Sequence, residues 1–297
     1  MSNLFRKKSL TELMKDHVGE VSGEHTLKRT LTATSLIFLG IGAIIGAGLF
    51  VRTAAAAANN AGPSVTLAFV VAGVGCALAG LCYAEFASMI PIAGSAYTYS
   101  YATLGELIAW IIGWDLVLEY ALGAATVGIA WSEYLNKLLA YLGMNIPYQW
   151  CHSPFEASAA GVHGMMNIPA LFIILLLSLL LIKGTKESAL VNGFIVLSKV
   201  AIVILFIVFG WSYINPANHT PYIPASSIYT DTQGVPHNFG GIMGILGAAG
   251  VVFFAFIGFD AVSTAAQESI NPKKDMPVGI LGSLAICTVL YILFAHV

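Results

Sequence analysis

The chain has 297 residues, of which 58% are hydrophobic and only 9% are charged, and its formal net charge is −2. Soluble globular domains carry about 25% charged residues, so this composition excludes a soluble protein of this length. The small negative charge suggests no nucleic-acid partner. The four cysteines have neither metal-site nor redox spacing, and no nucleophile–base set is evident. We therefore expect no metal, no cofactor and no enzymatic activity.

Seven apolar stretches are predicted to be membrane-spanning helices. They lie near residues 35–58, 64–89, 106–135, 168–182, 189–213, 241–266 and 278–297. Helices are expected because backbone groups in hydrocarbon must be paired within the segment, whereas a β-barrel shows short alternating stretches. Residues 1–33 are predicted to be a cytoplasmic tail, and 34–297 a multi-pass domain of the cell (plasma or inner) membrane. In this orientation most of the 13 Lys and Arg residues lie on the cytoplasmic side.

The first span contains a cluster of glycines, at Gly40, Gly42, Gly46 and Gly48. One interpretation is close helix packing, for which Gly42 and Gly46 have the right spacing. The other is a helix that unwinds in mid-membrane, since each glycine costs roughly 1 kcal/mol of helix stability. Unwound backbone at this depth lines a cavity, where free N–H groups bind a carboxylate and free carbonyls bind an ammonium. We favour this interpretation, which predicts a site for an amino acid.

Ionisable residues lie within three of the predicted spans. Asp115 and Glu119 share a face of the third span, and they are either functional or a hydrogen-bonded structural pair. Lys199 lies roughly 15 Å into the fifth span, near the middle of a hydrocarbon core about 30 Å thick. It either extends to the surface or titrates in place. We favour titration, because burial disfavours the charged form and lets a lysine gain and lose a proton near neutral pH.

The sixth span contains Ile257-Gly258, followed by Asp260. Transporters with inverted repeats have two broken helices at corresponding points of their two halves, five helices apart. The pair formed by Ile45-Gly46 and Ile257-Gly258 is predicted to be such points. Asp260 and Glu119 are predicted to contact a substrate side chain or to shape a gate.

Several motifs resemble the amino acid–polyamine–organocation (APC) superfamily of permeases, and among them the cationic amino acid transporter subgroup. The motifs are GAIIGAGLF at 42–50, YAEF at 83–86, PIAGSAYTY at 91–99, the segment 253–264 and ESINP at 268–272. The resemblance implies an all-α integral membrane protein with the leucine-transporter-type fold, whose ten core helices form two inverted five-helix repeats. The chain is then expected to carry the first seven helices, with a first repeat at about 34–214, an incomplete second repeat at about 240–297, and a truncated C-terminus.

The resemblance also implies roles for individual residues. Backbone N–H groups of Ala47 and Gly48 are expected to hold the substrate carboxylate, carbonyls of Ile44, Phe254 and Ile257 the amino group, and Phe254 to gate the site. The full set of predicted substrate-binding residues is Ile44, Gly46, Ala47, Gly48, Phe254, Ala255 and Ile257. In proton-coupled bacterial members a lysine at the position of Lys199 contacts carbonyls of the unwound first helix.

The sequence therefore predicts a secondary transporter for proton-coupled uptake of cationic and/or neutral amino acids. Its partners are expected to be the amino acid, the proton and the lipid bilayer, and a small accessory membrane subunit is a further candidate. The alternative is an incomplete fragment, or a non-transporting membrane subunit that needs the missing helices. An ion channel would show filter-like loops or rings of like charge, and neither is evident.

Overall fold

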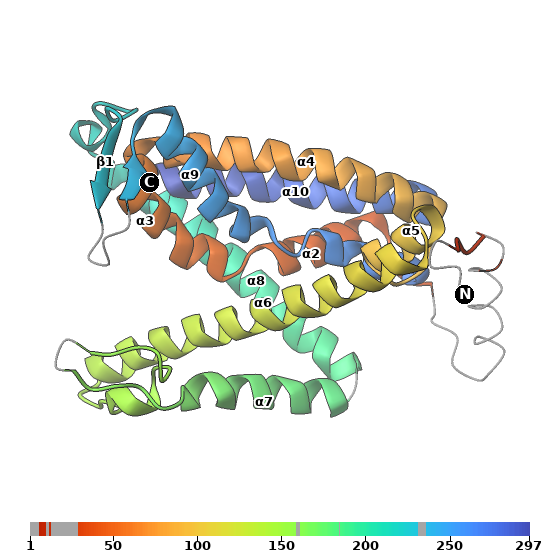
Figure 1. Cartoon of the computed structure of the whole chain (residues 1–297), viewed down its shortest axis with the longest axis horizontal. Helices are drawn as coiled ribbons and strands as arrows, with labels where there is room; N and C mark the ends of the chain where they lie inside the picture. Colours follow the sequence, from red (N-terminus) through yellow and green to blue (C-terminus); the bar gives the residue numbers. More distant parts are fainter. Residues whose placement is uncertain (1–5, 10–11, 13–28, 159–160, 184, 231–235) are drawn as a thin grey trace. The chain divides into compact units, whose positions relative to one another are not determined.

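The computed structural model describes residues 6–9, 12, 29–158, 161–183, 185–230 and 236–297 (Figure 1). The chain divides into two compact units, one formed by Met1–Trp114 with Ile195–Val297 and the other by Asp115–Phe194. Helices α6 and α8 each contribute residues to both units. The two units are described separately below.

The first unit is almost entirely helical in its described residues. Its elements are α2 (Ala33–Ile44), η1 (Gly48–Arg52), α3 (Thr53–Ala56), η2 (Ala57–Ala61), η3 (Gly62–Ser64), α4 (Val65–Met89), α5 (Ser95–Thr103), the start of α6 (Glu106–Tyr141), the end of α8 (Thr185–Gly210), η5 (Trp211–Tyr213), η6 (Pro216–His219), β1 (Ser227–Thr230), β2 (Pro236–Phe239), α9 (Gly241–Phe253), η7 (Phe254–Phe256), η8 (Asp260–Glu268) and α10 (Pro272–His296). The second unit holds the rest of α6 and α8, η4 (Tyr148–Trp150) and α7 (Ile168–Lys183).

Local sequence explains where the principal helices begin. Thr32 caps α2, because its hydroxyl accepts a hydrogen bond from the Ser35 N–H. Pro272 is the first residue of α10, where its fixed φ suits a helix and its missing N–H costs nothing. The Asp275 carboxylate then accepts a hydrogen bond from the Asn271 N–H at 3.0 Å. These signals start α10 at Pro272, six residues before the start at 278 that hydrophobicity alone predicts.

The core of the first unit lies between α2, α4, α9 and α10, and Figure 1 shows α4 and α10 running side by side. Its centre is aromatic. The rings of Phe69, Phe256 and Tyr291 are fully buried, with centroids 5.3–6.3 Å apart. Edge-on and tilted ring pairs at this distance add attraction beyond the area they bury. The aromatic centre therefore fixes α4 and α10 against the sixth predicted span.

Five helical stretches in the described residues are long and apolar enough to cross a membrane. They are Gly48–Met89, Glu106–Tyr141, Gly193–Tyr213, Gly241–Glu268 and Pro272–His296. Two shorter apolar helices, Ala33–Ile44 and Ile168–Ile182, account for the remaining predicted spans. The first of these is short because its span is interrupted after Ile44. The all-α membrane fold expected from the sequence is confirmed.

The structure contains a β-hairpin that the sequence analysis did not predict. Within the predicted loop at 214–240, β1 and β2 pair as an antiparallel hairpin, with Ser227 opposite Phe239. The strand β1 reads Ser-Ile-Tyr-Thr, and branched and aromatic side chains of this kind favour a strand. The Gly240 N–H donates to the carbonyl of Asn60, at 2.7 Å, so the hairpin is tied to the end of the first span.

In the second unit α6 and α7 pack against each other. A Cβ placed on Gly128 of α6 would lie 2.9 Å from Cδ1 of Ile174 on α7. The glycine thus permits the close approach of two helices, as small residues do in membrane proteins.

Candidate functional site

The first predicted span is broken between Ile44 and Gly48, and residues 42–48 around this interruption are here called the first break. The helix α2 ends at Ile44, Ile45 is extended with ψ 106°, and helical structure resumes at Gly48. The break leaves carbonyls at the end of α2 and N–H groups at the start of η1 without partners inside their own helices. Gly46 lies beside open space, since no described atom lies within 4 Å of a Cβ placed there.

The sixth predicted span is broken between Phe256 and Asp260, and residues 254–260 around this interruption are here called the second break. The short 3₁₀ helix η7 ends at Phe256, Ile257 leaves the helical conformation with ψ 135°, and Gly258 has φ +106°. Only glycine adopts that φ readily, because it has no Cβ. The chain continues as the nine-residue 3₁₀ helix η8. Runs of 3₁₀ helix this long are uncommon and often mark a hinge.

The two breaks lie against each other, and glycines make the approach possible. A Cβ on Gly48 would lie 2.3 Å from Cα of Ala255, and a Cβ on Gly258 would lie 2.8 Å from the carbonyl oxygen of Ala43. The part of the first span after its interruption therefore touches η7, while the part before it touches Gly258. The fold brings together predicted site residues that lie more than 200 positions apart in the sequence.

Lys199 reaches the first break from α8. Its ammonium donates to the carbonyls of Gly42 and Ile45, the second at 2.7 Å. The side chain is half-buried. Hydrogen bonds from a charged donor are roughly twice as strong as neutral ones, so a protonated Lys199 stabilises the end of α2.

Tyr291, on α10, joins the two breaks. Its hydroxyl lies 2.9 Å from the carbonyl oxygen of Ile44 and 2.9 Å from that of Ala255, and the residue is fully buried. A hydroxyl has one proton, so it donates to only one of these carbonyls at a time. The contact holds one carbonyl from each break within reach of the same donor.

We expect Tyr291→Phe to lower the free energy of unfolding by about 2 kcal/mol, because two buried carbonyls lose their shared donor while the ring remains. Thermal unfolding in detergent measures the change. Thr288→Val on the same helix is the matched control, since the Thr288 hydroxyl donates within α10 to the Leu284 carbonyl, 2.7 Å away. Equal unfolding temperatures for the two variants would contradict a structural link through Tyr291.

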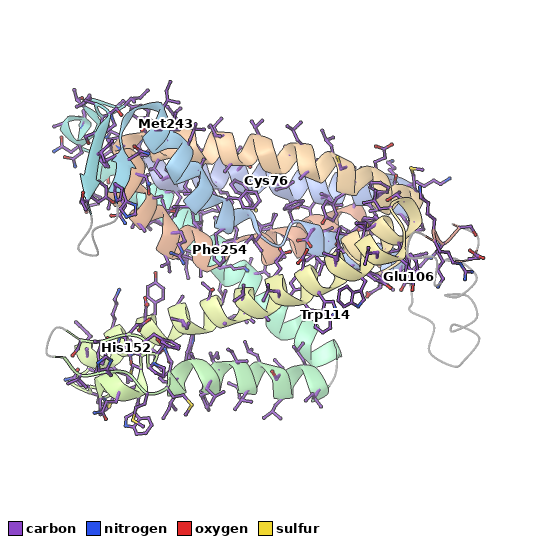
Figure 2. All side chains as sticks on the ribbon, viewed as in Figure 1. Cys76, Glu106, Trp114, His152, Met243 and Phe254 are labelled. Carbon is purple, nitrogen blue, oxygen red and sulfur yellow. The ribbon has the colours of Figure 1, made fainter. Side chains whose placement is uncertain are left out.

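Phe254 begins η7 and lies beside η1 (Figure 2), and it is half-buried. The Arg52 guanidinium carbon lies 5.8 Å from the centre of its ring. Phe254 therefore lies at the start of the second break, and its role as a gate stays a prediction.

The two predicted acids are in different units. Asp260 is buried in the first turn of η8, two residues after Gly258, and a carboxylate there interacts favourably with the N-terminal end of the helix. Glu119 is half-buried on the part of α6 that belongs to the second unit. Their roles in gating or specificity stay predictions.

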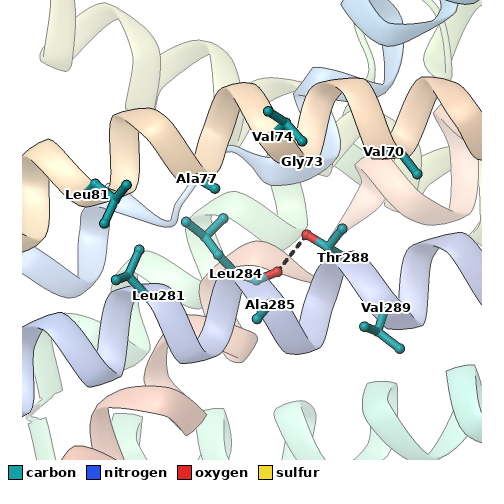
Figure 3. Close-up of a pocket in the computed structure, with 10 residues that line it drawn as sticks. All are labelled: Val70, Gly73, Val74, Ala77, Leu81, Leu281, Leu284, Ala285, Thr288 and Val289. Carbon is teal, nitrogen blue, oxygen red and sulfur yellow. Dashed lines mark hydrogen bonds between the residues drawn. The ribbon is translucent and has the colours of Figure 1, made fainter.

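A hollow of about 520 Å³ lies between α4 and α10, and Figure 3 shows its lining. Its walls are aliphatic, from residues such as Val74, Leu81, Leu281 and Val289. The Thr288 hydroxyl donates to the Leu284 carbonyl of its own helix, so its proton is not available to a carboxylate. The lining of this hollow is otherwise aliphatic, whereas the two breaks interrupt the backbone hydrogen bonds of their helices.

Sequence reasoning missed Tyr291 and the position of Arg52. A signal for Tyr291 was present, because a tyrosine hydroxyl in the middle of an apolar span must find a hydrogen-bond partner there. Nothing in its spacing indicates which partner. Its two acceptors lie 247 and 36 residues away in the sequence.

Comparison with known proteins shows which family the chain is similar to. Residues 31–297 match the family model described as "Amino acid permease". The chain is 47% identical over 292 residues to the methylthioribose transporter of Bacillus subtilis (strain 168), and 46% identical over 290 residues to the branched-chain amino acid permease BcaP of the same strain. Each of these matches covers 98% of this chain. It is also 40% identical over 279 residues, 93% of its length, to cationic amino acid transporter 9, chloroplastic, of Arabidopsis thaliana.

The chain spans 58% of the length of each Bacillus relative and 46% of the Arabidopsis one. The resemblance to APC permeases expected from the motifs is confirmed, and these relatives are named as transporters and permeases rather than enzymes. The apolar helices and the family together make this a multi-pass membrane protein. The chain belongs to the amino acid permease family of the APC superfamily.

Proposed function

We propose that this chain forms the substrate-binding part of a secondary active amino acid transporter. One observation carries the proposal. The first and second breaks lie against each other, and carbonyls from both accept hydrogen bonds from Lys199 or Tyr291. Broken backbone at membrane depth is stable only where it is buried in protein or lines a cavity. A zwitterion that offers both a donor and an acceptor group suits such a site.

The substrate carboxylate is held by the N–H groups of Ala47 and Gly48, at the start of the outer half-helix. The substrate ammonium has three N–H donors, and the carbonyls of Ile44, Phe254 and Ile257 accept them. In this scheme the Tyr291 hydroxyl occupies the Ile44 carbonyl when no substrate is bound. Gly46 provides the open space, and Ala255 and Phe254 form the wall on the side of η7.

Proton coupling is assigned to Lys199. A charged Lys199 holds the carbonyls of Gly42 and Ile45 firmly, and loss of its proton weakens both bonds. The inner half of the first span then becomes free to move. We place the protein in the cell membrane with its N-terminus in the cytoplasm, and transport is inward. Residues 1–33 form the cytoplasmic tail and 34–297 the transmembrane domain. The two repeats lie at about 34–214 and 240–297, the second of them incomplete. Glu119 and Asp260 are proposed to act in gating or side-chain specificity.

The names of the relatives indicate which substrates to test first. They include a branched-chain amino acid permease, a methylthioribose transporter and cationic amino acid transporters. The second candidate is a fragment or membrane subunit that does not transport alone. It is supported by the chain spanning only 58% of the length of the methylthioribose transporter. A small accessory membrane subunit is a candidate partner in either case.

The test is uptake of labelled amino acids into proteoliposomes, with and without an inward proton gradient. This chain is compared with a longer form that carries the segment its relatives have beyond the match. Uptake of a neutral or cationic amino acid that increases with the gradient supports the proposal. Uptake by the longer form alone assigns the chain to the fragment alternative, and uptake by neither form overturns the transporter.

A further inference from the structure

We propose that Arg52 is a charge filter at the outer side of the substrate site, so that the site takes amino acids with neutral side chains and disfavours those with cationic ones. The inference rests on the proposed function and narrows its substrate class. It is carried by the contact between Arg52 and Phe254 and by the close packing of η1 on η7.

The position of Arg52 follows from the helix that carries it. Arg52 ends η1, four residues after Gly48, so it lies about one turn, roughly 6 Å, farther along the outer half of the first span. Gly48 itself touches Ala255, the neighbour of Phe254. The guanidinium carbon is 5.8 Å from the centre of the Phe254 ring, within the distance at which a cation is attracted to a ring face.

The charge of Arg52 is held in place without being neutralised. An aromatic ring attracts a cation but carries no net charge, whereas a carboxylate would cancel it. In the part of the chain that the structure describes, no carboxylate lies within ion-pair distance of Arg52. Arginine does not lose its proton in proteins, so this charge is permanent. Asp260, the acid of the second break, instead lies at the N-terminal end of η8, whose partial positive charge it offsets.

A cationic substrate would meet this charge directly. Its side chain would lie against Phe254, the same ring that holds the guanidinium. Two like charges roughly 10 Å apart, at an effective dielectric constant of about 20, repel by an amount equal to roughly tenfold in affinity. A neutral side chain experiences no such repulsion and packs on the ring. The spacing of Arg52 in the sequence does not indicate this role, because the Phe254 ring beside it comes from a distant span.

The experiment measures binding of leucine and of lysine to the purified chain in detergent, at low ionic strength, by competition against a labelled amino acid. Three variants are compared with the wild type. Arg52→Gln removes the charge, Arg52→Lys keeps it, and Lys137→Gln is the matched control. Lys137 also has its charged group over a ring, 5.7 Å from the centre of Tyr134, but on α6 in the other unit.

We expect the wild type to prefer leucine, and Arg52→Gln to raise the ratio of lysine affinity to leucine affinity about tenfold. Arg52→Lys and Lys137→Gln are expected to keep the wild-type ratio. An unchanged ratio in Arg52→Gln, or a wild type that binds lysine as well as leucine, overturns the charge filter alone. Loss of leucine binding in Arg52→Gln without any gain in lysine binding also overturns it, because Arg52 would then bind the α-carboxylate of the substrate. A wild type that binds neither amino acid overturns the proposed function itself.

Discussion

Gly48→Ala is expected to lower the free energy of unfolding by roughly 3 kcal/mol and to remove amino acid binding. The added Cβ would lie 2.3 Å from Cα and 2.7 Å from N of Ala255. Both are backbone atoms, so no side chain can turn away to relieve the contact. The two breaks would have to separate. Thermal unfolding in detergent and binding of labelled leucine measure the two consequences.

Gly46→Ala is the matched control, two residues away in the first break. No described atom lies within 4 Å of its added Cβ, so the free energy of unfolding is expected to change by less than about 0.5 kcal/mol. The pair separates steric contact from the loss of a glycine as such. Equal unfolding temperatures for Gly46→Ala and Gly48→Ala would show that η1 and η7 are not in close contact.

Lys199→Met is expected to abolish the response of uptake to an inward proton gradient. One proton that crosses a gradient of one pH unit supplies about 1.4 kcal/mol, enough for about tenfold accumulation of a co-transported amino acid. Methionine has a similar length but carries neither charge nor donor, so the carbonyls of Gly42 and Ile45 lose their partner. Accumulation into proteoliposomes is compared at equal pH and with the inside one unit more alkaline.

Lys137→Met is the control for loss of a lysine, and it is expected to keep the tenfold response. Exchange of labelled for unlabelled amino acid, without a gradient, tests whether Lys199→Met still forms the substrate site. A variant that exchanges but does not accumulate fits a proton carried on Lys199. Full gradient-driven accumulation by Lys199→Met would assign the proton to another group.

Much of the fold could be predicted from the sequence, because the membrane restricts the choices. Backbone in hydrocarbon must pair within helices, so apolar length alone indicated where the apolar helices lie, five of which are long enough to cross a membrane in the described residues. The clustered glycines at 42–48 indicated the first break, since they weaken a helix. The correspondence between inverted repeats indicated the second, at Ile257-Gly258. The depth of Lys199 in its span likewise indicated a lysine inside the protein, and its contacts with the first break fit that expectation.

The remaining features depend on contacts that one-dimensional patterns do not contain. Tyr291 reads as one more large residue in an apolar helix, and only the fold gives it two carbonyls from distant spans. The sequence around Arg52 resembles that of an ordinary residue at the end of a span, and only the structure shows that Phe254 lies beside it. The hairpin of β1 and β2 is too short to stand out within a polar loop. The break at Gly258 was predicted, but its contact with Ala43 follows from packing alone.

The central claim is that the two breaks together recognise the α-carboxylate and the α-ammonium of an amino acid. Binding of leucine, leucine methyl ester and N-acetyl-leucine to the purified chain tests it most directly, because each analogue removes one charge and keeps the side chain. A buried site left with unpaired groups rejects an analogue by roughly 10⁴-fold when its partner is missing. We predict that leucine binds and that both analogues lose binding by at least about a hundredfold. Comparable binding of leucine and either analogue would contradict the account.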